Sequence, residues 1–136
     1  MSTQDGYLAG GPVGFGEAVS QGWSNVFTYR GRASRSAYWW LYLLGILLGA
    51  VVALVIGATG ATGHGKALFI GLASLVGGVL VLYQALALLA ALVRRLHDTD
   101  RSGWWVLISL VPLVGGIWLL VLTVLPGTAG SNRFGP

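Results

Sequence analysis

Long apolar runs separated by short polar intervals dominate the chain from Tyr38 onward. The runs cover residues 38–58, 67–93 and 104–125. An α-helix rises about 1.5 Å per residue, so each run is long enough to cross the roughly 30 Å hydrocarbon core of a bilayer. The pattern therefore predicts three transmembrane helices over these residues.

A different pattern precedes the first run. Residues 1–14 are polar and rich in glycine, which predicts a disordered tail. In residues 15–28 apolar side chains recur at helical spacing with polar ones between them, which predicts a short amphipathic helix. We expect this helix to lie in the membrane interface, and packing against the protein's own spans is the alternative. Residues 15–136 thus form one predicted membrane domain: an all-α integral membrane protein with an N-terminal interfacial amphipathic helix and three transmembrane helices.

The third apolar run contains a strong helix breaker. Pro112 is followed by Gly115 and Gly116, and proline removes a backbone donor and clashes with the preceding turn. We therefore expect a kink in the third span. In its extreme form the kink becomes a break, which divides the span into two half-helices and returns the chain to its starting side.

Two features inside the first two spans indicate helix packing. Gly45 and Gly49 stand four residues apart and give the first span a small face, along which another helix can approach closely. Gln84 lies near the middle of the membrane in the second span, where an amide needs a partner. We expect it to make an interhelical hydrogen bond, and a place on a substrate path is the alternative.

The composition agrees with a membrane protein. The chain is 55% hydrophobic and 9% charged, whereas a soluble domain is typically about 25% charged. The net charge of +4 does not indicate nucleic-acid binding, because the basic residues flank apolar runs instead of forming a separate stripe. The absence of cysteine excludes disulfides, thiolate metal sites and a cysteine nucleophile.

The basic residues also predict an orientation. One side of the membrane receives Arg30, Arg32, Arg35, Arg94, Arg95 and Arg101. The other side receives Lys66 and, if the third span crosses fully, Arg133. Because basic residues stay in the cytoplasm, the N-terminus and the loop over residues 94–103 are expected to be cytoplasmic.

Three separated motifs carry a resemblance to a known family. They are Arg30-Gly31-Arg32-Ala33-Ser34-Arg35 before Tyr38-Trp39, then Arg94-Arg95-Leu96-His97-Asp98-Thr99 with Arg101-Ser102-Gly103-Trp104-Trp105, and finally Gly130-x-Asn132-Arg133-Phe134-Gly135-Pro136. In this order they resemble the domain of unknown function 805 family of small bacterial inner-membrane proteins. The resemblance implies a multi-pass protein of the bacterial inner (plasma) membrane, and it implies no established activity or catalytic residue.

The central motif has two interpretations. Its arginines offer donors at headgroup depth that suit the phosphate of an anionic phospholipid. Alternatively, Arg94 pairs with Asp98, and Arg95 or Arg101 pairs with Asp100, which leaves a neutralised loop. If the third span is broken, the C-terminal tail can join this site. The candidate contacts with anionic lipid or a partner protein are Arg30, Arg32, Arg35, Arg94, Arg95, His97, Asp98, Asp100, Arg101, Asn132 and Arg133.

Metal binding and acid–base chemistry are weaker interpretations of the same motif. His97, Asp98 and Asp100 are acceptable ligand types, but they are nearly adjacent and no second cluster completes a coordination shell. His97 beside Asp98 resembles a general base without a nucleophile. We therefore predict no metal, no cofactor and no catalytic residue.

The function predicted first is a non-enzymatic membrane component that contacts anionic lipid or a partner protein through cytoplasmic arginines. A small oligomeric transporter or channel subunit is the alternative, suggested by Gln84 and by the break at Pro112. A membrane enzyme acting on lipid phosphate is less favoured. The expected partners are the lipid bilayer, a second copy of the chain or a membrane protein, and no nucleic acid.

Overall fold

The computed structural model describes residues 11–58 and 64–135, and these ranges are helical apart from turns, loops and isolated bridge residues. In chain order the elements are α2 (Phe15–Ser24), α3 (Arg35–Ala58), α4 (His64–Asp98), the 3₁₀ helix η1 (Gly103–Leu110) and α5 (Val114–Val124). Most of the predicted disordered tail, residues 1–10, lies outside the described residues. Val13, in the described part of that tail, is buried, and its N–H donates to Ser36 Oγ.

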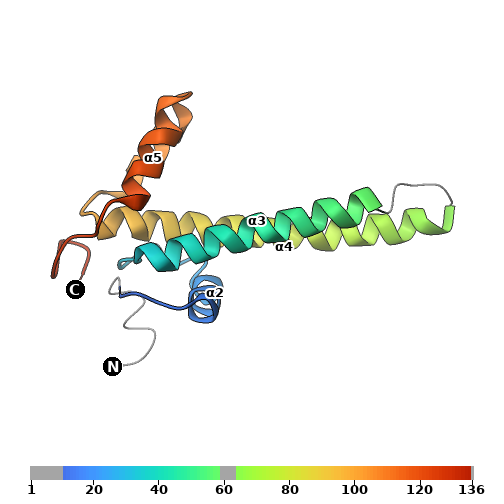
Figure 1. Ribbon diagram of the computed structural model, residues 1–136, viewed down its shortest axis with the longest axis horizontal. Coiled ribbons are helices and arrows are strands. Elements are labelled where there is room, and N and C mark those ends of the chain that lie inside the picture. Colours follow the sequence, from blue (N-terminus) through green and yellow to red (C-terminus); the bar gives the residue numbers. More distant parts are fainter. Residues whose placement is uncertain (1–10, 59–63, 136) are drawn as a thin grey trace.

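The helices α3 and α4 form the body of the molecule. They lie side by side as an antiparallel pair (Figure 1). Both are long and apolar enough to cross a membrane, and at 24 and 35 residues they measure about 36 and 52 Å along their axes. Large apolar side chains such as Leu54, Leu68 and Leu75 are exposed on them. Such a surface suits lipid, because a helix satisfies its own backbone hydrogen bonds and presents only side chains outward.

Side-chain burial is concentrated at the end of this pair where α3 begins and α4 ends. Leu41 of α3 is fully buried in a cluster with Tyr38 and Ala91. Two further alanines of α4, Ala87 and Ala90, are also fully buried. These small side chains stand three and four residues apart and form one face of α4, along which neighbouring helices approach closely.

The helix α2 packs across this end of the α3–α4 pair. It buries Ala18, Gln21 and Gly22, and a side chain at Gly22 would overlap Leu41 of α3. Packing on the protein's own spans, one of the two alternatives for residues 15–28, is therefore present. Phe15 and Phe27 remain 44% and 76% exposed on the outside, so an apolar surface is left that a membrane interface can also cover.

Gln84 joins α2, α3 and α4. Its Nε2 donates to Leu41 O at 2.7 Å, and its Oε1 accepts from Trp23 Nε1 at 2.6 Å. A Cβ atom at Gly45 would lie 3.6 Å from Gln84 Cγ, whereas nothing would lie within 4 Å of one at Gly49. The small face therefore meets the amide at Gly45, and Gly49 faces open space.

The single transmembrane helix expected over residues 104–125 is not formed. The chain instead forms η1, reverses over residues 111–113 and continues as α5. Pro112 has no N–H with which to continue a helix, and Leu113 after it adopts a φ of +66°, in the left-handed region. The extreme form of the predicted kink therefore occurs, and the third apolar run becomes a short helical hairpin.

Both ends of the η1–α5 hairpin lie beside the last turns of α4. Arg95, in the last turn of α4, donates to the carbonyls of Thr123 and Leu125 at the end of α5. Figure 1 shows η1 and α5 leaving this end of α4 at a steep angle to the long helices. The tail after α5 therefore returns to the end of the molecule where α3 begins.

Gly115 is the closest approach within the hairpin. A Cβ atom on this residue would overlap the carbonyl group of Ile108 in η1. Only glycine leaves the space that the neighbouring backbone occupies. Gly116, the next residue, has nothing within 4 Å of the same position.

Replacing Gly115 with valine is therefore expected to destabilise the protein by about 1–3 kcal/mol, the usual cost of overpacking, or more if the hairpin opens. The matched control is Gly116→Val, which adds the same atoms to open space and is expected to cost less than about 0.5 kcal/mol. Thermal unfolding in detergent, followed by circular dichroism, measures both. An equal loss in the two variants would contradict the close approach of η1 and α5.

Candidate functional site

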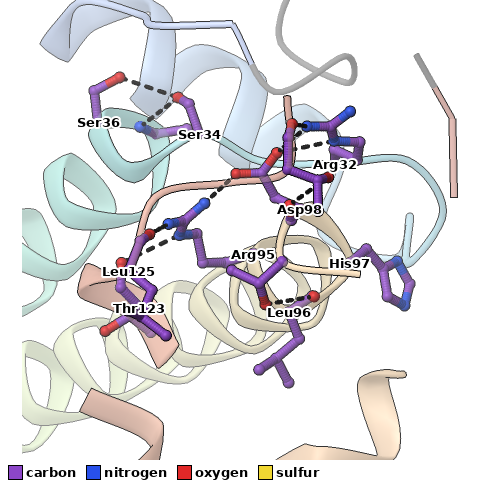
Figure 2. A network of polar contacts seen from close by, with 12 residues as sticks. Arg32, Ser34, Ser36, Arg95, Leu96, His97, Asp98, Thr123 and Leu125 are labelled. Atoms are coloured by element: carbon purple, nitrogen blue, oxygen red, sulfur yellow. Dashed lines mark hydrogen bonds and ion pairs between the residues drawn. The ribbon is translucent and has the colours of Figure 1, made fainter. Parts of the chain in front are cut away.

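Most charged residues of the described chain gather where α3 begins and α4 ends. Four of them, Arg32, Arg94, Arg95 and Asp98, have exposed fractions of 5% or less, and the neighbouring His97 is 9% exposed. Figure 2 shows most of this network: Arg32 from the segment before α3, Arg95 and Asp98 from the last turn of α4, and Thr123 and Leu125 from the end of α5. Because burying a charge is costly unless it is paired and hydrogen-bonded, the partners of each group decide what the site can do.

Asp98, the last residue of α4, is the centre of the network. Its Oδ1 accepts from Arg32 Nε at 2.9 Å and lies 2.8 Å from Arg32 Nη2. Its Oδ2 accepts from Arg95 Nη1. A side chain at Gly127 would overlap this carboxylate, so glycine lets the tail pass close to it. One carboxylate thus neutralises part of the charge of two buried guanidinium groups.

The backbone carbonyl of Asp98 holds the tail as well. Thr128 donates to it twice, through its N–H at 2.8 Å and its Oγ1 at 3.0 Å. The last carbonyls of a helix have no partner within the helix, so Thr128 supplies partners that α4 lacks. This contact fixes the tail against the end of α4.

Arg95 supplies partners to the end of another helix. Its Nε donates to Thr123 O at 3.1 Å, and its Nη2 donates to Leu125 O. These carbonyls lie at the C-terminal end of α5, where the helix dipole favours a cation. Arg95 therefore ties the returning half of the hairpin to α4.

Arg32 and Arg94 tie down two further segments. Arg32 donates to Gly130 O and to Thr128 O, the latter at 2.7 Å, so it binds the tail. Arg94 donates to Asn25 O at 3.2 Å and Thr28 O at 3.0 Å, so it binds the turn after α2. The buried arginines thus connect α2, α5 and the tail to the end of α4.

His97 contacts both the segment before α3 and the tail. Its Nδ1 lies 3.2 Å from Gly31 O, and its ring stacks on Phe134 with 3.9 Å between the ring centres. Asn132 Nδ2 donates to His97 O at 2.9 Å. The imidazole is therefore held between backbone and aromatic ring, and its surroundings are those of a packed side chain.

Asp100 and Arg133 form a separate pair at the surface. Arg133 Nε lies 3.2 Å from Asp100 Oδ1, with side-chain exposures of 60% and 47%. Arg133 also donates to Asp100 O at 2.6 Å. A pair this exposed contributes about 0–1 kcal/mol, so it guides the tail without anchoring it.

Three further arginines at this end lie outside the buried network. Arg30 and Arg35 are exposed, and Arg101 is half-buried with one weak contact to Thr99 O at 3.4 Å. Within the described part of the chain, none of the three forms an ion pair. These side chains are therefore available to a ligand, whereas the buried arginines are occupied.

The ion pairs differ from those that the sequence spacing indicated. Asp98 pairs with Arg32 and Arg95, not with Arg94, and Asp100 pairs with Arg133. The network joins residues from three parts of the sequence, including Asn132 and Arg133. The candidate contacts named from the sequence did not include the serines and tail residues that complete the network: Ser34, Ser36, Gly127, Thr128 and Gly130. Ser34, in the position of a helix N-cap, was the one with a signal in the sequence, because its Oγ accepts from Ala37 N–H.

Metal ligation was a weaker interpretation of His97, Asp98 and Asp100. In the described ranges no group of three or more histidine, cysteine, aspartate or glutamate side chains is placed to hold a metal ion. The carboxylate of Asp98 forms ion pairs with two arginines, and Asp100 pairs with Arg133 at the surface. The site is therefore an arginine–carboxylate network.

Comparison with known proteins agrees with a membrane protein. Residues 26–136 match the model of a family described as "Protein of unknown function (DUF805)". The chain is similar to two inner membrane proteins of Escherichia coli strain K12: YhaH, at 39% identity over 82% of this chain and 88% of the relative, and YhaI, at 38% identity over 82% and 86%. No solved structure gives a significant match.

Proposed function

This chain belongs to the DUF805 family of proteins of unknown function, and from that membership and its geometry we propose a non-enzymatic component of the bacterial inner membrane. The α3–α4 pair anchors it. The end that carries the arginines lies in the cytoplasm and contacts the headgroups of anionic phospholipids. The observation that carries the proposal is the set of arginines outside the buried network without an ion pair in the described chain, Arg30, Arg35 and Arg101.

The distribution of charge along the long helices supports this orientation. Seven of the eight basic residues belong to the end where α3 begins and α4 ends, because the tail that contains Arg133 returns there. The eighth, Lys66, is in the first turn of α4, at the opposite end. The asymmetry is larger than the sequence alone indicated, and it is the asymmetry typical of a cytoplasmic face.

The division between buried and exposed arginines decides which residues contact lipid. Arg32, Arg94 and Arg95 bind carbonyls and a carboxylate within the protein. Removing them would test folding and not lipid contact. Arg30, Arg35 and Arg101 lie at the level where the apolar surface of the helices ends, and each is expected to contribute about 1 kcal/mol of attraction to an anionic surface.

The two features that suggested a transporter, Gln84 and the break at Pro112, both have a role within the packing of the protein. The amide of Gln84 is used within the protein by Trp23 and Leu41. The break at Pro112 is the turn of a hairpin that packs on itself at Gly115. Neither feature now requires a substrate path.

The test is the preference of the protein for anionic lipid. We expect the wild-type protein, purified in a neutral detergent, to retain phosphatidylglycerol and cardiolipin over phosphatidylethanolamine, as counted by native mass spectrometry. Arg30→Gln with Arg101→Gln should lower this preference about fivefold per charge removed, the equivalent of about 1 kcal/mol each. A control at Arg133→Gln, whose charge is already paired, should change it little. Unchanged retention in the double variant would refute the lipid contact.

A further inference from the structure

A cavity of about 480 Å³, lined by several charged and hydroxyl-bearing residues, opens where α3 begins and α4 ends. Its walls include the side chains of Arg32, Ser34, Arg35, Ser36, Arg95 and Asp98. Gly127 and Thr128 of the tail also line it. We propose that this cavity binds one phosphate group, carried either by a lipid headgroup or by a soluble phosphate ester.

The charge of the cavity favours an anion. Three guanidinium groups face one carboxylate, so two positive charges are in excess. The cavity also lies at the N-terminus of α3, where the helix dipole adds further positive potential and where the first turn contains no acidic residue. Cations at a helix N-terminus repel the dipole, and a bound anion would relieve that repulsion.

The buried guanidinium of Arg95 does not use all of its N–H donors within the described chain. It carries five N–H groups, of which one goes to Thr123 O, one to Asp98 and one to Leu125 O. Two N–H groups, one on each Nη atom, have no acceptor among the described residues. Arg95 borders the cavity, but its side chain is 0% exposed. It therefore contributes positive potential to the cavity, and a ligand oxygen would meet the more exposed Arg35 and Ser36 first.

The two serines offer a further donor. Ser34 Oγ and Ser36 Oγ lie 3.0 Å apart (Figure 2). Each already accepts a backbone N–H, from Ala37 and from Val13 respectively. Whichever hydroxyl donates to the other, one of the two hydroxyl protons has no acceptor within the described chain. Since both side chains line the cavity, this proton is available to a ligand oxygen.

These donors suit a phosphate group. Its oxygens accept several hydrogen bonds at once, and guanidinium groups bind it with two parallel bonds. The cavity is larger than one phosphate, so it also has room for the glycerol or sugar to which the phosphate is attached. The inference deepens the proposed function and rests on it for the lipid source only, because diffuse contact through surface arginines needs no cavity.

The experiment compares two exposed arginines, one inside the cavity lining and one outside it. Arg35 lines the cavity and Arg30 does not, although both are exposed and five residues apart. Binding of inorganic phosphate and of dihexanoyl phosphatidylglycerol to the full chain in maltoside detergent is measured by isothermal titration calorimetry. We expect Arg35→Gln to weaken binding of both probes at least tenfold. Arg30→Gln should change the binding of inorganic phosphate less than twofold and weaken the binding of the lipid probe by no more than about fivefold, the share of one surface charge. Size-exclusion elution and circular dichroism verify that both variants are folded.

The outcomes separate the cavity from the general lipid contact. Loss with both probes in Arg35→Gln supports a phosphate site open to soluble ligands, and loss with the lipid probe alone supports a headgroup site. If Arg30→Gln and Arg35→Gln weaken lipid binding equally, the cavity is refuted while the proposed lipid contact stands. If the wild-type protein binds neither probe yet retains anionic lipid in mass spectrometry, the cavity is refuted alone. If it binds neither probe and retains no anionic lipid, both proposals fail.

Discussion

Replacing Asp98 with asparagine is expected to destabilise the protein by about 3–5 kcal/mol, the range seen when one member of a buried ion pair is removed. The amide has nearly the same size, but it lacks the negative charge that Arg32 and Arg95 share. The side chains of these arginines are 6% and 0% exposed, so water cannot compensate for the loss. The change is measured as a fall in the midpoint of unfolding by guanidinium chloride in detergent.

A matched control lies two residues further on. Asp100→Asn makes the same chemical change in a pair that is about half exposed, and surface pairs contribute about 0–1 kcal/mol. We therefore expect this variant to unfold within about 1 kcal/mol of the wild-type protein. Equal losses at the two positions would show that Asp98 does not hold the network together.

A cysteine at residue 129 is expected to react with a membrane-impermeant maleimide from the same side of the membrane as a cysteine at residue 20. The chain has no native cysteine, so Ala129→Cys and Ser20→Cys report without background. Both residues are exposed, one on the tail and one on α2. The tail returns to the end of α4 through Thr128 and Asn132, which places both cysteines at the same end of the molecule. Labelling from one side only is therefore expected for both.

The control for sidedness is Thr62→Cys, between α3 and α4, which should react only from the opposite side. Labelling of Ala129→Cys from that opposite side would mean that the third apolar run crosses the membrane. In that case Arg32 and Asp98 could not contact the tail of their own chain, and the cavity beside them would lose one wall.

The long helices were predictable because lipid imposes a simple rule. A spanning segment must be a continuous apolar helix, and the runs at residues 38–58 and 67–93 correspond to α3 and α4. Both helices begin slightly earlier than the apolar pattern indicated, at Arg35 and His64. The helix α4 also continues through its polar last turn to Asp98, which a criterion based on apolar residues excludes.

The third run shows where the same rule fails. Its length and composition satisfied the requirement for a span, and only Pro112 and the following glycines indicated otherwise. Whether such a segment kinks or reverses depends on what its two halves can contact. Here the backbone of Ile108 lies against Gly115, and Arg95 binds the carbonyls at the end of α5. Those contacts are tertiary and leave no local pattern.

The ion pairs of the site could be predicted only in part from the sequence. Helical spacing makes both Arg94 and Arg95 neighbours of Asp98, and it cannot choose between them. The choice comes from the turn after α2, whose carbonyls hold Arg94. Arg32 is separated from Asp98 by 66 residues, so no local rule connects the two. The clustering of polar residues was visible in the sequence, and their pairing required the fold.

The reversal at residues 111–113 has a consequence for biosynthesis. With both ends of the η1–α5 hairpin on one side, only the segment between α3 and α4 has to be translocated. Residues 59–66 contain one lysine and no acidic residue, and the transfer of charged groups through hydrocarbon is the main obstacle to insertion. In the proposed orientation, all seven arginines remain on the cytoplasmic side, where the ribosome is. The chain is therefore expected to insert into the bilayer as a helical hairpin, without exporting any sizeable polar domain.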